Sequence, residues 1–264
     1  MTIGERLAAH GLALPPGHTL ISIGERPDLE RPAGMLNGSV WPEFMFHDGV
    51  VQANWHHLFE EFSETQCCLF DADGELVATL NSAPIAWDGT DDGLPLGWDD
   101  QMLRTVAGLL PGALPADTLG ALQIVVRPDR QGQGYAGIMV AAMRAMARSR
   151  GYRAVIACVR PTHKERYPLT LIERYAFWTR EDGLPVDPWI RLHARLGGRI
   201  VRGVPASMTM RGTVAEWREW TGLAMPESGL YLPAGAAAPV QIDVAADEGV
   251  YCDPNVWMVH DLTG

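Results

Sequence analysis

Three glycines in residues 127–137 have the spacing of a loop that binds phosphate. The stretch reads RPDRQGQGYAG, with Gly132, Gly134 and Gly137 in a G-x-G-x-x-G frame. Glycine lets the backbone come close to a ligand, and the free N–H groups at the start of a following helix stabilise a bound anion. The residue types and their spacing therefore predict a loop that holds a phosphate or a pyrophosphate.

A nicotinamide or flavin dinucleotide is the first ligand that this frame suggests, but the surrounding residues argue against it. The dinucleotide pattern places the first glycine directly at the end of a strand, with an acidic residue about twenty positions further on. Here the residues RPDRQ separate Val126 from Gly132, and the next strand is followed by no acid before Glu165. We therefore expect another carrier of the pyrophosphate.

The elements around the loop would hold it in position. Residues 119–126 (LGALQIVV) and 152–160 (YRAVIACVR) are apolar runs typical of buried strands. Residues 136–150 between them are rich in Ala, Met and Arg, which favour a helix, and Gly151 can end that helix. The sequence thus predicts a strand, the glycine loop, a helix and a second strand.

Further elements are expected on both sides of this unit. The sequence predicts a strand at 18–25, a helical region at 42–62, a hairpin at 67–80, a loop at 81–100, helices at 99–110, 187–196 and 214–220, and strands at 199–204 and 207–211. The remaining residues, after the last of these helices, are expected to be irregular or β.

The composition of the 264-residue chain limits its class. Apolar residues make up 47% and charged residues 20%, as expected for a packed globular protein. The net charge of −11 argues against a nucleic-acid partner. Charged residues interrupt the N-terminal apolar run, so neither a signal peptide nor a membrane span is expected. The four cysteines form no C-x-x-C pair, which favours a reduced, cytoplasmic protein with buried thiols.

The glycine segment resembles the core motif of the GNAT superfamily of N-acetyltransferases. Its signature V-x-P-x-x-[QR]-x-x-G-x-[GA] matches this chain at Val126, Pro128, Gln131, Gly134 and Ala136. The order of the flanking elements is also similar to that of the family.

The resemblance, which covers residues 19–211, implies a fold and a domain division. The expected fold is an α/β (α+β type) GNAT fold, with a mixed central sheet that splays open after the motif strand and is flanked by helices. Residues 1–211 would form the core with an N-terminal extension. Residues 212–264 would form a C-terminal extension packed on that core.

The resemblance implies acetyl-CoA, or another acyl-CoA, as the cofactor, and no metal. Pantetheine would hydrogen-bond along the motif strand like an added strand, and the pyrophosphate would lie on the loop. Six arginines against one acid in residues 127–153 support an anionic ligand in this otherwise acidic chain. The residues expected to bind the cofactor are Leu122, Ile124, Val125, Val126, Arg127, Arg130, Gln131, Gly132, Gln133, Gly134, Tyr135 and Ala136.

Two departures from the family pattern concern catalysis, which is mainly proximity and orientation of the two substrates. A tyrosine usually stands four residues before the glycine that ends the late helix, and this chain has His193 there. A histidine can act as an acid, or it can simply be a half-buried helix residue. Many members also carry a glutamate base on the motif strand, where this chain has only Gln123. A nearby acid such as Glu60 or Glu173 could substitute, although no sequence pattern places either one at the site.

In these departures the chain resembles a GNAT-like branch found in polyketide synthase loading modules. That branch uses a His and a Thr to decarboxylate malonyl thioesters, and it can pass the acetyl group to a carrier-protein thiol. The similarity implies catalytic roles for His193 and Thr162, and a carboxylate or phosphopantetheine contact for Arg211. The alternative for Thr162 is an ordinary turn residue.

The acidic loop WDGTDDGLPLGWDD has two interpretations. As a lid, its Trp87 and Trp98 would cover the acyl end of the site and bind substrate. Alternatively, the two tryptophans anchor a solvated loop to the core. His56 and Glu60 have the i, i+4 spacing of a pair of metal ligands, but no third ligand is evident and we treat them as ordinary helix residues.

The leading prediction is an acyl-CoA-dependent acyltransferase, an N-acetyltransferase that moves acetyl from acetyl-CoA to a small amine. The alternatives are a malonyl thioester decarboxylase or S-acyltransferase, and a non-catalytic acyl-CoA-binding module. The expected partners are a small-molecule acyl acceptor or a carrier-protein thiol, with no nucleic acid and no membrane. A homodimer remains open.

Overall fold

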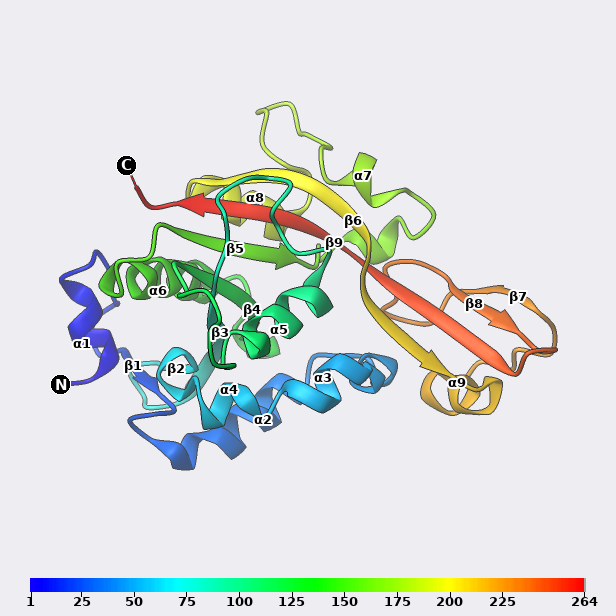
Figure 1. Cartoon of the computed structure of the whole chain (residues 1–264), viewed down its shortest axis with the longest axis horizontal. Helices are drawn as coiled ribbons and strands as arrows, with labels where there is room; N and C mark the ends of the chain where they lie inside the picture. The colour runs from blue at the N-terminus through cyan, green and yellow to red at the C-terminus, as the bar shows by residue number, and fades with distance from the viewer. Residues whose placement is uncertain (264) are drawn as a thin grey trace.

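One mixed sheet of nine strands organises the computed structural model, which describes residues 1–263 (Figure 1). Neighbouring strands run in the order β1-β2-β3-β4-β5-β9-β8-β7, and β6 pairs with β9 as well. The strands are β1 (Thr19–Ser22), β2 (Cys67–Phe70), β3 (Leu76–Ile85), β4 (Thr118–Val126), β5 (Ala154–Val159), β6 (Gly198–Gly212), β7 (Gly229–Tyr231), β8 (Val240–Asp243) and β9 (Glu248–Asp261).

Helices cover both faces of the sheet. They are α1 (Ile3–Ala8), α2 (Glu30–Gly38), α3 (Gly49–Asn54), α4 (His57–Glu60), α5 (Trp98–Ala107), α6 (Tyr135–Ser149), α7 (Ile172–Tyr175), α8 (Pro188–Arg195) and α9 (Val214–Thr221). Short 3-10 helices are η1 (Pro27–Leu29), η2 (Glu43–His47), η3 (Ser63–Thr65), η4 (Pro128–Arg130) and η5 (Lys164–Arg166). Among residues 1–263, no helix has the length and apolar character needed to cross a membrane.

The helix after the glycine loop packs as its sequence predicts. Met139, Met143 and Met146 recur at helical spacing along α6, and all three are fully buried against β4 and β5. On the other face, α5 lies over β3, β4 and β6. The core therefore consists of two apolar layers, one on each side of the sheet.

The separation of β4 and β5 creates the space for a site. These two parallel strands pair only from Thr118 and Ala154 to Ala121 and Ala157. Beyond that point β4 continues to pair with β3, and Leu122 forms a bulge in the ladder. One edge of residues 122–126 is consequently free of strand partners within residues 1–263. The splayed GNAT-type sheet that the sequence predicts is confirmed.

The C-terminal segment is part of the sheet, in contrast to the expected division at residue 211. Strand β9 pairs with β5 on one side and with β6 on the other. The buried run from Val256 to Val259 explains this position, because an apolar strand on both faces belongs inside a sheet. The first residues of β9 pair with the last residues of β6 and form an arm. This arm carries α9, β7 and β8 (Figure 1).

Several boundaries also differ from the sequence prediction. The expected strands at 199–204 and 207–211 are one strand, β6, whose pairing shifts between Val204 and Met208. The loop predicted from residue 81 begins later because β3 continues to Ile85. The helical region at 42–62 is divided into η2, α3 and α4, where Asp48 caps α3 by accepting hydrogen bonds from Val50 and Val51.

Candidate active site

A cavity of about 920 Å³ opens where β4 and β5 separate. Its walls come from residues 122–126, the glycine loop, the start of α6, one face of α8, and the segment around η2 and α3. A concave site with apolar walls and a few polar groups is typical of ligand binding. Because it contains both the loop and the separated strands, this cavity is the candidate active site.

The glycine loop lies at one end of the cavity. Gly132 and Gly134 have φ angles of 78° and 90°, in the left-handed region that favours glycine. Gly134 directly precedes α6, whose first N–H groups have no partner within the helix. The expected cofactor-binding residues that line the cavity are Leu122, Ile124, Val125, Val126, Gln131, Gly132, Gly134, Tyr135 and Ala136.

Arg127, Arg130 and Gln133 do not line the cavity, so their contact with the cofactor stays a prediction. Arg127 Nε lies 2.7 Å from a carboxylate oxygen of Asp129, and Arg130 Nη2 lies 3.6 Å from Asp71. The excess of arginine near the loop is therefore partly compensated by nearby acids. One of them, Asp71, comes from a distant hairpin, so the arginine count along the segment overstated the local positive charge.

His193 is fully buried in the wall of the cavity, on α8. Its Nδ1 lies 2.9 Å from Nε2 of His260 on β9, and its Nε2 has no partner among residues 1–263. Burial and the neighbouring His260 lower the pKa of His193 to about 3. Burial and Arg144 lower the pKa of His260 to about 4. Both imidazoles are therefore neutral at pH 7, and His193 is not protonated beforehand to act as a conventional general acid.

The start of α8 connects His193 to the turn that carries Thr162. Asp187 caps the helix by accepting hydrogen bonds from the backbone N–H groups of Trp189 and Ile190. Its second oxygen accepts from the backbone N–H of His163, at 2.8 Å. Thr162 lines the cavity, so the structure brings both catalytic candidates, Thr162 and His193, to the same space.

The expected substrate contacts divide into one inside the cavity and two outside it. Trp98 lines the cavity, and its Nε1 donates to the carbonyl of Leu122 at 2.9 Å. Trp87 is outside, with its Nε1 bonded to the carbonyl of Thr90 in its own loop. Arg211 is an exposed residue of the β6–β9 arm, 2.9 Å from Glu248, and it also lies outside the cavity.

Residues 87–97 of the acidic loop are attached to the sheet, and none of them lines the cavity. Asp91 pairs with Arg199 of β6, and the Nε1 of Trp257 on β9 donates to the Pro95 carbonyl at 2.9 Å. Arg153 lies over the ring of Trp87, 5.4 Å from its centre. These contacts favour the anchored loop over the lid.

Sequence reasoning missed the residues on the far side of the cavity from the loop. Trp41, Trp55, Arg160 and Asn255 line this part. Their spacing carries no motif, and Asn255 lies on the strand assigned to the extension. Neither expected substitute for the base, Glu60 or Glu173, lines the cavity. Gln123, which stands where the family carries its glutamate, does line it.

Two carboxyl groups lie close together beside Trp98, outside the lining. Asp48 and Asp99 each accept a hydrogen bond from the backbone N–H of Thr209, at 3.3 and 3.0 Å. Burial and the charge of Asp48 raise the pKa of Asp99 to about 8. The pair therefore shares a proton at neutral pH, because two buried carboxyl groups that bond to the same N–H are too close for both to ionise.

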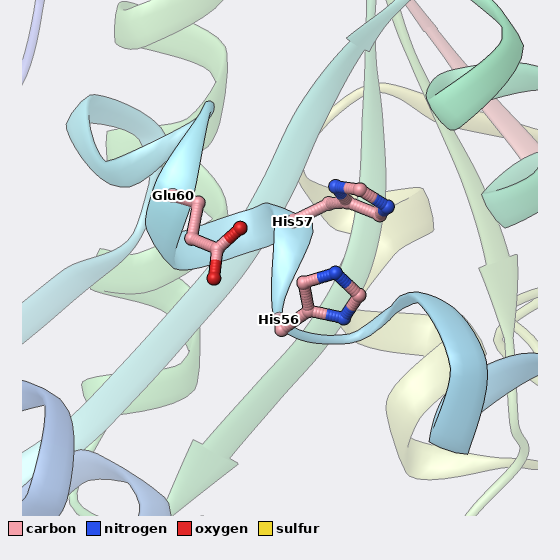
Figure 2. Close-up of side chains that lie close together, drawn as sticks. All are labelled: His56, His57 and Glu60. Carbon is pink, nitrogen blue, oxygen red and sulfur yellow. The ribbon is translucent and has the colours of Figure 1, made fainter.

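One group of side chains has the composition of a metal site. Potential ligand atoms of His56, His57 and Glu60 lie within 4.8 Å of one another at the start of α4 (Figure 2). The third residue of the group, His57, already has a partner, because its Nδ1 is 3.1 Å from a carboxylate oxygen of Glu61. None of these residues lines the cavity, so the chemistry of the candidate active site does not involve them.

The fold and the cavity define an acyltransferase of the GNAT superfamily. The model of the acetyltransferase (GNAT) family matches residues 35–177, and the chain belongs to that family. It is 31% identical to the arginine N-acetyltransferase avaD of Aspergillus versicolor, over 98% of this chain and 99% of the relative. The chain is therefore an enzyme, and the non-catalytic alternative is set aside.

Solved structures agree with this assignment at the level of the fold. The loading GNATL domain of CurA from Lyngbya majuscula is similar with a TM-score of 0.60 and 16% identity, covering 92% of this chain and 97% of that domain. The GphF GNAT-like decarboxylase in complex with isobutyryl-CoA has a TM-score of 0.56 and 18% identity, over 92% and 98% of the two chains. The suspected similarity to this branch is confirmed for the fold.

Proposed function

We propose that this enzyme transfers the acetyl group of acetyl-CoA to a nitrogen of a small cationic acceptor related to arginine. The observation that carries the proposal is the cavity that joins the glycine loop to an aromatic chamber through the gap between β4 and β5. The arginine N-acetyltransferase relative, similar along nearly the whole chain, supports the acceptor class.

The donor end of the cavity fits a pantetheine attached to a pyrophosphate. Residues 122–126 offer an edge without strand partners, to which an extended amide chain can hydrogen-bond. The N–H groups that follow Gly134 provide an anion site at the start of α6. Acetyl-CoA supplies an acetyl group activated as a thioester. The protein would hold it in place and leave the reacting carbon accessible from the other side.

The other end of the cavity fits a flat cation. The rings of Trp55 and Trp98 are nearly parallel, with centres 6.4 Å apart, and Trp41 lines the same chamber. A guanidinium or ammonium group gains about 0.5–2 kcal/mol from the face of a tryptophan. The net charge of −11 favours the approach of such a cation.

We assign to His193 the role of a neutral imidazole at the thioester. When His260 Nε2–H donates to Nδ1 of His193, the Nε2–H of His193 is available to donate to the developing thiolate. A neutral donor of this kind stabilises the leaving group without being charged beforehand. Thr162 would contribute a hydroxyl beside it.

A screen of amines with acetyl-CoA, followed by release of the free thiol, tests this function. We expect turnover with L-arginine and related cationic amines, and a gain of one acetyl group in the mass of the acceptor. Turnover with malonyl-CoA alone, accompanied by release of carbon dioxide and by no amine acetylation, would overturn the proposal.

The second candidate function is decarboxylation of a malonyl thioester with transfer to a thiol. The observation that favours it is the presence of Thr162 and His193 in one cavity. Dependence of carbon dioxide release on both side chains would identify it. The His193→Phe and Thr162→Val variants are the matched pair for this test.

A further inference from the structure

Arg160 comes immediately after β5. It lies on the face of the sheet that carries Trp98, where the proposed acceptor would bind. Side chains of β5 alternate, with Ala157 and Val159 packed toward Ile190 of α8. Cys158 faces the opposite layer, together with Trp98. Arg160 continues the second series and lines the cavity. It is therefore separated by the sheet from the layer formed by α6 and α8.

The guanidinium of Arg160 is held rigidly on one side. Its Nε lies 3.0 Å from both carboxylate oxygens of Asp253, and its Nη2 donates to the Gly235 carbonyl at 2.8 Å. Asp253 is itself fully buried and accepts a hydrogen bond from Tyr251. The guanidinium carbon is 5.5 Å from the centre of the Trp41 ring. These contacts fix the plane of the guanidinium before any ligand arrives.

The opposite side of the same group is unused. Among residues 1–263, no atom accepts a hydrogen bond from Nη1 of Arg160, and the side chain is 20% exposed. The Nε1 of Trp41, which also lines the cavity, is buried without a partner in the same part of the chain. Two kinds of donor are thus available in the acceptor chamber with nothing to accept from them.

Lys164 is a second basic residue near Asp253. Lys164 is fully buried, and its ammonium donates to the carbonyl groups of Ala237 and Tyr167. Burial lowers the pKa of Lys164, while Asp253 acts in the opposite direction, so the two groups interact. Arg160 carries a positive charge, and its one carboxylate partner, Asp253, is bonded at Nε. A ligand carboxylate at the unused Nη1 would form a charge-assisted hydrogen bond with the guanidinium.

We propose that Arg160 forms a carboxylate subsite, which binds the carboxylate of an amino-acid acceptor while the cationic end lies on the tryptophans. This inference rests on the proposed function. A guanidinium fork matches a carboxylate in geometry as well as in charge. The same chemistry would accept the carboxylate of a malonyl group. The acceptor is the source proposed here, because Arg160 lies on the face opposite α6 and the glycine loop.

The test compares L-arginine with agmatine, which differs from arginine only in lacking the carboxylate. Losing a charged partner in a buried site costs about 2–5 kcal/mol, so kcat/KM of the wild type is expected to favour arginine by roughly 30-fold or more. In Arg160→Gln, kcat/KM for arginine should fall by a similar factor, while the value for agmatine should change less than about threefold. Arg180→Gln, an exposed arginine outside the cavity, is the control that loses a charge without losing discrimination.

A second variant guards against a simple loss of folding. Arg160→Gln leaves Asp253 buried without its partner, so Arg160→Gln combined with Asp253→Asn removes both charges together. The ratio of arginine to agmatine turnover in each folded variant is the decisive quantity. Equal turnover of the two substrates by the wild type, or a ratio unchanged in both variants, would overturn the subsite.

The two possible sources of the carboxylate give different results. If Arg160→Gln lowers decarboxylation of malonyl-CoA at least tenfold and leaves the ratio of arginine to agmatine unchanged, the carboxylate belongs to the acyl donor and the acceptor assignment is overturned. If no amine is acetylated at all, the proposed function fails first. Acetylation of agmatine and arginine at equal rates leaves the function intact and rejects only the subsite.

Discussion

His193 occupies the position where the family pattern places a tyrosine, but its surroundings do not make it a conventional acid. The ring is buried against His260, and the pKa of His193 is lowered to about 3. A group with this pKa gains a proton only far below neutral pH. Its contribution to catalysis must therefore come from hydrogen bonding by the neutral imidazole.

The state of His193 predicts a pH profile. The imidazole of His193 stays neutral from pH 5 to pH 7. In this range the wild type and His193→Phe should therefore show the same shape of kcat/KM against pH, with no inflection due to His193. The variant itself should lower kcat by about 100-fold, as for loss of a hydrogen-bond donor to a developing charge. Steady-state kinetics across this range checks both points. An inflection near pH 6.5 that depends on His193 would contradict the assignment.

Two glycines of the loop provide a matched pair at the residue scale. Gly134 has a φ of 90° and open space around its missing side chain, so an added Cβ is penalised by the backbone alone. A Cβ at Gly137 would meet only Leu192, at 3.7 Å. Thermal unfolding should show Gly134→Ala less stable by about 1 kcal/mol, whereas Gly137→Ala, inside α6, should be more stable by about 0.5–1 kcal/mol. Equal losses in the two variants would contradict this explanation of the motif.

At the scale of elements, local pattern was sufficient for some parts and insufficient for others. The strand β4, the loop and α6 follow from apolar runs, glycine spacing and the methionine stripe. The position of β9 does not, because pairing of strands distant in sequence leaves no local signal. Consequently His260, Asn255 and Asp253, all on β9, entered the site unpredicted. No sequence pattern distinguishes Arg160, because its orientation depends on Asp253 of β9, which is distant along the chain.

The carboxyl pair that connects α3, α5 and β6 predicts how stability depends on pH. The pKa of Asp99 is raised to about 8 by burial and Asp48, above the ordinary value of an aspartate. The folded state therefore binds a proton that the unfolded state releases, and this stabilisation is lost as pH rises from about 4 through about 8. In Asp99→Asn this part of the decline should disappear. Chemical unfolding at pH 6 and pH 8 measures it, and an identical decline in the variant would contradict the shared proton.

At the scale of the molecule, the enzyme is one sheet closed by its own C-terminal strand. β9 lies between β5 and β6 and pairs with both. The helix α8, which carries His193, packs against β6. The chain 1–247, which ends just before β9, should therefore fail to fold cooperatively. Circular dichroism during thermal unfolding tests this. A cooperative transition in the shortened chain, with retained binding of acetyl-CoA, would show that the segment is a separable extension.

Binding of acetyl-CoA to the complete protein, measured by calorimetry, tests the central claim most directly. With the free edge of β4 and the N–H groups after Gly134 available, the wild type should bind with a Kd of about 1–100 μM, in the range of ordinary enzyme substrates. Gly134→Ala should bind more weakly. The absence of any heat with acetyl-CoA or coenzyme A, together with tight binding of NADP, would contradict the account.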